Sequence, residues 1–275
     1  MNGVAAASIV GTGIAGNGII ISGASRGLGA ELARRFAAPG TAQLLIARSA
    51  AALDSVAEEC RARGATVTTA ALDVRAARAL GDAVLAFDTA HPVALAIANA
   101  GISRGRGLDG APEGHDGATA QIATNLLGAM NLIEPLLPRM RARRSGHLAL
   151  IASISAFRSL PDAPGYSASK AGLWAYGEAL RAQHRGSGVS VTTVAPGFFR
   201  SAMEARFRGP KPLAIGLDQA ATRIERALRA RAARAVFPLS LALLLRVLDA
   251  LPAALADRAS LALRFRVAPE TGTLP

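Results

Sequence analysis

Tyr166 and Lys170 lie four positions apart, and Ser153 lies thirteen positions before the tyrosine. Side chains four positions apart share one face of a helix, so a helix that begins near Tyr166 would bring its phenol and the Lys170 ammonium to the same ligand. A nearby positive charge lowers the pKa of a tyrosine toward the range that general acid–base catalysis needs. The chain has only two tyrosines and two lysines among 275 residues, so a tyrosine and a lysine at this spacing are rarely expected by chance. The pair therefore indicates a proton donor. An exposed helical turn without chemistry is the alternative.

A glycine-rich loop follows the first apolar run, residues 18–22, and precedes a helical pattern of Leu28, Leu32 and Phe36. Glycines in such a loop let a pyrophosphate approach the backbone, and free amides at the helix start bind it. The loop therefore predicts a dinucleotide phosphate site, with an ordinary strand-to-helix turn as the alternative. The loop residues assigned to this site are Gly23, Ser25, Arg26, Gly27, Leu28 and Gly29.

A second glycine pattern, residues 11–16, matches G-x-G-x-x-G letter for letter but lies before the first strand. A phosphate loop must follow a strand and open a helix. We therefore expect no phosphate binding there. The small, glycine-rich residues 1–17 are expected to be loosely ordered.

Strand-like and helix-like segments alternate through most of the chain, which is typical of a parallel, doubly wound α/β sheet. After an irregular, glycine-rich stretch, one long helix is expected from about residue 117 to 144, and it carries Asn125. The expected strands are residues 18–22, 42–48, 67–72, 93–98, 147–152, 189–194 and 235–238.

Residues with the potential for binding follow the ends of these strands. Gly23, Asp73, Asn99, Ser153 and Pro196 each come at or just after the end of a predicted strand. Open α/β sheets bind ligands along the edge formed by the carboxyl ends of their strands. These distant positions are therefore expected to converge on one cleft.

The composition favours a single helix-covered sheet, because 51% of the residues are hydrophobic and only 4% are aromatic. The single cysteine, Cys60, has no partner for an intrachain disulfide or for a cysteine metal site, so we expect a reducing compartment. The four histidines are isolated and no cluster of metal ligands is visible in the sequence, so we expect no metal. The apolar N-terminus lacks the charged n-region of a signal peptide. A cytoplasmic protein is expected.

The net charge of +12 raises the question of a nucleic acid partner. The arginines are spread along the chain with few aromatics among them, and no known binding motif is present, so no nucleic acid partner is expected. The apolar run 239–251 is broken by Arg246 and Asp249 and followed by Pro252, so it cannot span a bilayer. Packing or an oligomer contact explains this run, and docking of the apolar, basic tail on a membrane surface is the alternative.

The chain resembles the single-domain short-chain dehydrogenase/reductase family over about residues 17 to 203. Two departures are mild: Ser22 stands where the family often has threonine, and Ala98 where it often has a first asparagine. The tail from Arg206 on differs from the family's common ending. The motifs that carry the resemblance are Ser22-Gly23-x3-Gly27-x-Gly29, Asn99-Ala100-Gly101, Asn125, Ser153, Tyr166-x3-Lys170 and Pro196-Gly197.

The resemblance implies an architecture. It is a single-domain Rossmann fold with about seven parallel strands in the order 3-2-1-4-5-6-7 and helices on both faces. The domain would comprise residues 18–238, with a substrate loop at about 197–217. Residues 239–275 would form a C-terminal helical extension of the same domain.

The resemblance also implies a role for each motif residue. Tyr166 would protonate a carbonyl oxygen, or take the proton back from the alcohol, and Ser153 would hydrogen-bond that oxygen. Lys170 would contact the nicotinamide ribose and lower the pKa of Tyr166, while Asn125 would hold a water in the proton path. Beyond the glycine loop, the cofactor is expected at Arg48, Asp73, Val74, Asn99, Ala100, Gly101, Tyr166, Lys170, Pro196, Gly197 and Phe199. The substrate is expected at Ser153, Tyr166, Phe198 and Met203, with Phe207 nearby in the same loop.

The charges around the second strand favour NADP over NAD. An NAD site places Asp or Glu at the end of that strand, whereas this chain has Ala47, followed by Arg48, and has Arg26 in the glycine loop. Arginine matches the oxygens of a 2'-phosphate bidentately. NAD stays open, since two solvated arginines in an arginine-rich chain are the alternative.

The sequence thus predicts an NADP-dependent oxidoreductase that interconverts a ketone or aldehyde and an alcohol on a small or lipophilic substrate, as a homodimer or homotetramer. One alternative is an epimerase or dehydratase of nucleotide-sugars, which the glycine spacing and the short chain disfavour. Another is a nucleotide-binding scaffold without turnover, which the complete set of Ser153, Tyr166 and Lys170 disfavours.

Overall fold

Seven parallel strands form the central sheet of the computed structural model, which describes residues 16–261 and 264–269. The order β3-β2-β1-β4-β5-β6-β8 confirms the predicted topology. The predictions for residues 1–15, including most of the second glycine pattern, lie outside the described residues. The strands are β1 (Gly18–Ser22), β2 (Ala42–Ala47), β3 (Thr66–Ala71), β4 (Val93–Ala98), β5 (Gly146–Ile151), β6 (Val189–Pro196) and β8 (Arg234–Phe237).

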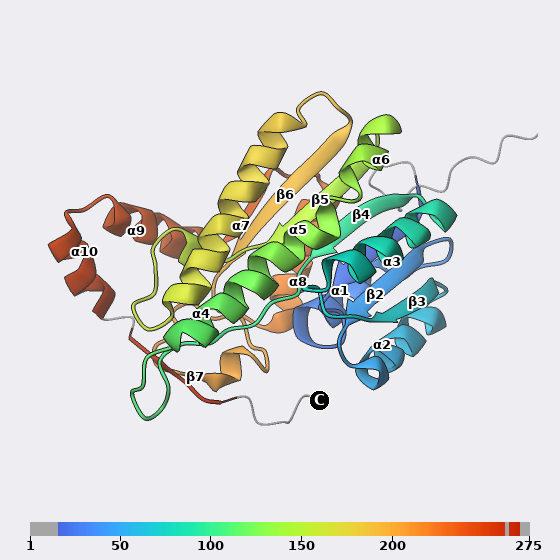
Figure 1. The fold of residues 1–275 in the computed structure, drawn as a ribbon. Helices are drawn as coiled ribbons and strands as arrows, with labels where there is room; N and C mark the ends of the chain where they lie inside the picture. Colours follow the sequence, from blue (N-terminus) through green and yellow to red (C-terminus); the bar gives the residue numbers. More distant parts are fainter. Residues whose placement is uncertain (1–15, 262–263, 270–275) are drawn as a thin grey trace, which may run out of the picture.

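Helices cover both faces of the sheet. Successive side chains of a strand point to opposite faces, so all five residues of β1 are buried only because both faces are covered. Ile19 and Ile21 pack in one core with helices α1, α2 and α8, whereas Ile20 packs in the other with α3, α5 and α7 (Figure 1). These helices are α1 (Gly27–Phe36), α2 (Ala50–Ala62), α3 (Ala77–Ala90), α5 (Gly128–Ile133), α7 (Pro164–Gln183) and α8 (Leu217–Arg229).

The seventh place in the sheet belongs to β8 because β7 pairs elsewhere. β7 (Phe207–Arg208) forms a short antiparallel pair with β9 (Arg266–Val267), outside the main sheet. This pair joins the loop after β6 to the C-terminal part of the chain.

The prediction of one long helix over residues 117–144 is wrong. α4 (Gly114–Gln121) runs into a π-helical segment, η1 (Ile122–Leu127), and then into α5, after which α6 (Leu137–Ala142) begins separately. Pro135 lies in the break, and proline removes a helical hydrogen bond and clashes with the preceding turn. Pro138 is tolerated because it lies in the first turn of α6.

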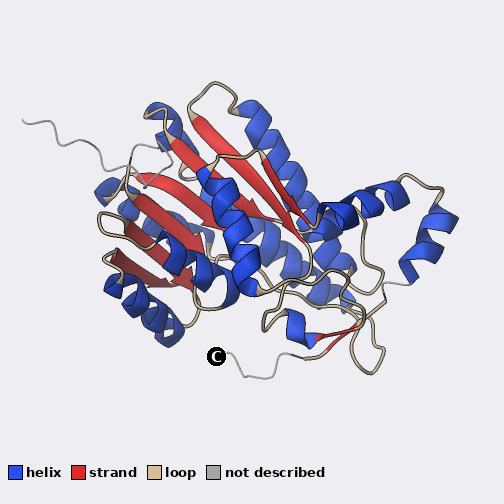
Figure 2. Cartoon of the chain, turned by 180° about the vertical axis from the view of Figure 1, so that it is seen from behind, coloured by secondary structure: helices blue, strands red, loops and turns tan. Residues whose placement is uncertain are grey.

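Two C-terminal helices, α9 (Leu239–Asp249) and α10 (Ala253–Ser260), project beyond the helix and sheet layers in both views (Figures 1 and 2). Across residues 16–261 and 264–269, no helix combines the length and the apolar character needed to cross a bilayer.

Asp88 holds α3, β4 and the segment around α6 together. Its side chain is almost fully buried and accepts hydrogen bonds from the Val93 amide at 2.8 Å and from Arg143 Nη1 at 2.8 Å, with Arg139 Nη1 at 3.3 Å. A buried carboxylate needs such partners, and its partners in turn need it.

We expect Asp88→Ala to destabilise the protein by about 2 to 3 kcal/mol, because it leaves the Val93 amide without an acceptor and the Arg143 guanidinium without its carboxylate partner. Urea unfolding would measure this change. Asp82→Ala on the same helix is the matched control, since Asp82 is exposed and should change stability by less than about 0.5 kcal/mol. Equal midpoints for the two variants would contradict the anchoring role.

Candidate active site

The glycine loop between β1 and α1 has a backbone that a bound ligand can approach closely. Gly23 and Gly27 have φ angles of +68° and +57°, which side-chain-bearing residues rarely adopt. A Cβ atom on Gly23 would lie 2.8 Å from the Cα atom of Ala100, and one on Gly29 would overlap the Gly23 carbonyl group. In the described structure neither a capping side chain nor an acidic residue covers the first turn of α1. Its amides therefore suit an anionic group such as a pyrophosphate.

Ser22 and Asn99 join the ends of β1 and β4. Ser22 Oγ accepts hydrogen bonds from the amides of Asn99 and Ala100, both at 3.1 Å. The Asn99 side chain donates to the Ser22 carbonyl at 3.0 Å and to the Gly23 carbonyl at 3.3 Å. A serine at position 22 thus supplies the acceptor that the neighbouring loop needs.

Arg48 is exposed at the end of β2, beside the glycine loop, whose Gly23 amide donates to the Ile46 carbonyl at 2.8 Å. Asp73 follows β3 and binds Arg75 at 2.7 Å. The hydrogen bonds from Arg75 lower the pKa of Asp73, to which Arg48 also contributes. Two arginines, Arg26 and Arg48, therefore flank this edge, while the nearby carboxylate is engaged with Arg75.

Val74 is buried next to Asp73, where a Cβ atom on Gly128 would press against its side chain. The Val74 carbonyl accepts a hydrogen bond from Asn131 at 2.9 Å. Ser25 and Leu28 lie in the glycine loop and the first turn of α1, where Leu28 is buried. Val74 and Leu28 can offer a cofactor only their backbone groups, whereas Ser25 can also offer its hydroxyl.

Ser153 and Tyr166 come together from different elements. Ser153 follows β5 and caps a short 3-10 helix, η2 (Ile154–Ala156), with its Oγ accepting from the Ser155 amide at 3.2 Å. Tyr166 lies in the first turn of α7. The two side chains are hydrogen-bonded to each other.

Burial shifts the pKa values of Tyr166 and Lys170 in opposite directions. The pKa of Tyr166 is raised by burial, an effect that its hydrogen bond with Ser153 partly opposes. Burial lowers the pKa of Lys170 to about 8. Lys170 Nζ donates to the Ile151 carbonyl at 2.7 Å and lies 5.8 Å from the centroid of the Tyr166 ring. The pKa of Tyr166 is therefore raised, not lowered as expected, because desolvation outweighs the hydrogen bond with Ser153.

Asn125 links the loop after β4 to α7. Its side chain accepts from the Ile102 amide at 2.8 Å and donates to the Ile102 carbonyl at 3.0 Å and to Ser169 Oγ at 2.9 Å. A Cβ atom on Gly101 would lie 3.2 Å from Asn125 Oδ1 and 3.6 Å from Lys170 Nζ. Gly101, Asn125 and Lys170 thus meet at one point beneath the strand ends.

An apolar cavity of about 120 Å³ opens beside Ser153 and Tyr166. Among the residues expected at the substrate, Phe198 and Met203 line it, as does Phe207. Phe199, which the sequence assigns to the cofactor, lines this cavity as well. The cavity is also lined by residues of the predicted substrate loop, Ser201, Glu204, Pro210 and Pro212, and by residues just after Ser153, Ile154, Ser155 and Leu160. Leu241 and Leu245 on α9 line it as well, and the sequence did not predict them. The Ser155 hydroxyl is buried without a hydrogen-bond partner, a signal that only the structure gives.

The loop after β6 closes over this cavity. Gly197 donates its amide to the Phe237 carbonyl at 2.7 Å, and Phe199 pairs with Ile215 across the loop. Lys211 and Glu204 form an ion pair at 2.6 Å. The loop is therefore held by its own contacts and by β8.

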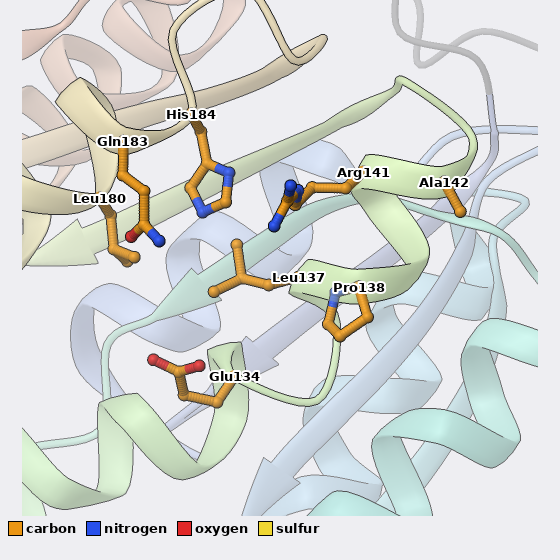
Figure 3. A pocket seen from close by; sticks show the side chains of 8 residues that line it. All are labelled: Glu134, Leu137, Pro138, Arg141, Ala142, Leu180, Gln183 and His184. Carbon is orange, nitrogen blue, oxygen red and sulfur yellow. The ribbon is translucent and has the colours of Figure 1, made fainter.

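A larger hollow of about 630 Å³ lies at the far end of α7 (Figure 3). It shares no residue with the predicted site, and Leu180 on its wall is fourteen residues beyond Tyr166, roughly 20 Å along the helix. Its lining residues are Glu134, Leu137, Pro138, Arg141, Ala142, Leu180, Gln183 and His184. Among the described residues, no group of three or more side chains could hold a metal ion.

Comparison with known proteins agrees with this arrangement. Residues 17–211 match the family model of the short chain dehydrogenases. A protein from Myxococcus xanthus described as an uncharacterized oxidoreductase is 34% identical over 246 residues, which cover 89% of this chain and 96% of that protein. The ketoacyl reductase HetN from Nostoc is 34% identical over 206 residues, or 73% of this chain and 70% of that protein.

Solved structures show the same fold. A short-chain dehydrogenase from Sphingobium yanoikuyae in complex with NADPH has a TM-score of 0.73 at 23% identity, over 93% of this chain and 99% of that one. L-sorbose reductase from Gluconobacter frateurii, complexed with NADPH and L-sorbose, has a TM-score of 0.70 at 21% identity, over 82% and 95% of the two chains. With a family match over most of its length and an oxidoreductase relative that covers nearly all of it, this chain belongs to the short-chain dehydrogenase family of oxidoreductases.

Proposed function

We propose that this protein transfers hydride between NADP(H) and the carbonyl or alcohol form of an apolar substrate, with Tyr166 as the proton donor. The observation that carries the proposal is the pairing of Ser153 and Tyr166 at the wall of a mainly apolar cavity. Two hydroxyl groups at the wall can bind a carbonyl oxygen, and the apolar walls can enclose the rest of the substrate. The site therefore suits a ketone or aldehyde with a hydrophobic body.

The raised pKa of Tyr166 keeps its phenol protonated at neutral pH, so it can give a proton to a substrate oxygen that becomes negative. Ser153 would donate a second hydrogen bond to that oxygen. The Lys170 ammonium, 5.8 Å from the centroid of the Tyr166 ring, would stabilise the phenolate that remains. The bound nicotinamide supplies the hydride.

Three features of the site suit a bound dinucleotide: the glycine loop, the uncapped first turn of α1 and the closeness of Gly101 to Lys170. Arg26 and Arg48 would bind the 2'-phosphate of NADP, and the neighbours complexed with NADPH support this cofactor. A water held by Asn125, assembly as a dimer or tetramer, the domain limits and a cytoplasmic location stay predictions.

Tyr166→Phe should reduce kcat for carbonyl reduction about 10² to 10⁴-fold, because it removes the proton donor but keeps the ring. NADPH oxidation with a panel of ketones and aldehydes would measure turnover. NADPH affinity, followed by its fluorescence, should stay within about threefold and reports that the site is folded. Unchanged turnover would refute the assigned role.

The pH profile should depend on Lys170. Because its pKa is about 8 in the folded protein, kcat/KM for reduction should fall as the pH rises through about 8 and the ammonium loses its proton. Lys170→Arg should lower the rate but remove this decline, since arginine keeps its charge. A decline that persists at the same pH in the arginine variant would assign it to another group.

Arg48→Asp should raise the KM for NADPH about ten- to a hundredfold and leave the KM for NADH nearly unchanged, because the new carboxylate repels a 2'-phosphate. Arg185→Asp, at the far end of α7, makes the same charge change away from the cleft and should affect neither cofactor. A wild-type protein that binds both cofactors equally would count against the NADP preference.

A further inference from the structure

The outer face of α9 is apolar and uncovered. Leu239, Leu243 and Val247 follow one another at intervals of four residues, and each is 55% to 60% exposed. Leu244 and Leu251 extend this face with exposures of 53% and 40%. A helix that is apolar on all sides is usually buried, so the exposed row implies that something covers it.

The opposite face of the same helix is already packed. Leu241, Ala242 and Leu245 are buried against Ile154 and Phe157, and Leu241 and Leu245 also line the apolar cavity beside Tyr166. The outer leucines are therefore not needed to hold α9 in place. α9 therefore lines the cavity with one face and carries the exposed apolar row on the other.

α10 continues the exposed surface. Leu255 and Leu261 are 57% and 50% exposed, and Arg258 lies three positions from each of them. Both views show α9 and α10 at the outer end of the molecule (Figures 1 and 2). We call the exposed large apolar side chains on and next to these two helices, together with Arg258, the α9–α10 surface: Leu239, Leu243, Leu244, Val247, Leu251, Leu255, Arg258 and Leu261.

The charges around the α9–α10 surface are mainly positive. Arg158 binds both nearby carboxylates, Asp257 at 2.7 Å and Asp249 at 3.4 Å. Arg246 stacks over the Phe157 ring at 4.1 Å, and among the described residues it has no carboxylate partner. Arg258 and Arg264 are exposed and likewise form no ion pair within the described part of the chain. The four arginines outnumber the two aspartates, on a chain whose net charge is +12.

We propose that the α9–α10 surface docks the protein on an anionic lipid membrane, with the leucines in the acyl boundary and the arginines at the headgroups. Leucine rows flanked by arginine are what an interfacial helix presents, and long arginine side chains reach the headgroups from an apolar face. A second copy of the chain fits less well, since a two-fold contact over α9 would bring like-charged arginines together.

Docking here would also place the cavity next to the bilayer. Because the inner face of α9 lines the cavity, an apolar substrate dissolved in the lipid would lie one helix away from Tyr166. The docking itself does not depend on the proposed reaction, since binding to lipid can be measured without turnover.

Cosedimentation of the full chain with vesicles tests the proposal. The wild type should bind vesicles of 70% phosphatidylcholine and 30% phosphatidylglycerol far better than pure phosphatidylcholine vesicles, and high salt should weaken this binding. Leu243→Ser combined with Val247→Ser should weaken it at least about tenfold, because two apolar side chains no longer enter the membrane. The matched control is Leu108→Ser with Leu127→Ser, two leucines of similar exposure elsewhere, which should bind like the wild type.

A second pair of variants separates local charge from net charge. Arg258→Gln with Arg264→Gln should weaken binding about fivefold for each arginine removed. Arg78→Gln with Arg185→Gln removes the same net charge away from the α9–α10 surface and should have little effect. Equal losses in both pairs would show unspecific attraction and overturn the proposal.

Two further measurements make the result decisive. Thermal midpoints within a few degrees of the wild type would show that the variants are folded, as expected for exposed positions. Sedimentation equilibrium without lipid would detect a dimer. Membrane docking would be refuted if the wild type did not bind anionic vesicles but formed a dimer, and if Leu243→Ser combined with Val247→Ser dissociated that dimer. The α9–α10 surface would then be a contact with a second copy of the chain.

Discussion

The side-chain amide of Asn125 is fully buried, and both of its polar atoms are hydrogen-bonded to the surrounding chain. Leaving a buried amide without hydrogen-bond partners destabilises the folded state by more than its hydrogen bonds stabilise it. The groups around Asn125 therefore have one favourable arrangement. That arrangement fixes Ile102 in the loop after β4 and Ser169 on α7. Lys170 is the next residue on α7, and its bond to the Ile151 carbonyl adds the end of β5 to the same junction. The buried network thus ties the loop after β4, the first half of α7 and the end of β5 together around Lys170.

Burial at this junction has an energetic consequence. Because the pKa of Lys170 is about 8 in the folded protein and 10.5 for the free side chain, the unfolded chain binds more protons between these two values. The penalty for burying the ammonium is thus complete below about pH 8 and disappears as the pH rises toward 10.5. The fold accepts this penalty at neutral pH, where the charge is useful beside a tyrosine whose own pKa burial raises. The same desolvation weakens the fold and strengthens any electrostatic effect on a reacting oxygen.

Much of the sheet could be predicted from the sequence, because apolar strands that end in Gly23, Asn99 or Pro196 are local patterns and the order of a parallel sheet follows from its connections. The break before α6 does not follow from the sequence pattern alone, because the helical pattern continues on both sides of Pro135. The direction of the Tyr166 pKa shift could not be predicted, because spacing shows which charge lies near but not how much water is lost. The cavity walls on α9 were also missed, since nothing local in that apolar run tells an inner from an outer face.

Part of the cavity wall lies outside the region that matches the family. The family match ends at residue 211, and the paired hydroxyls, Lys170 and the glycine loop all lie before that point. Pro212, Leu241 and Leu245, which help to shape the cavity, lie beyond it. Asp162 connects the two parts, because its buried carboxylate binds Arg106 at 2.9 Å and accepts the Phe265 amide at 3.0 Å, close to the pair of β7 and β9. A change in the tail can therefore alter the shape of the cavity beside Tyr166 without moving Ser153, Tyr166 or Lys170.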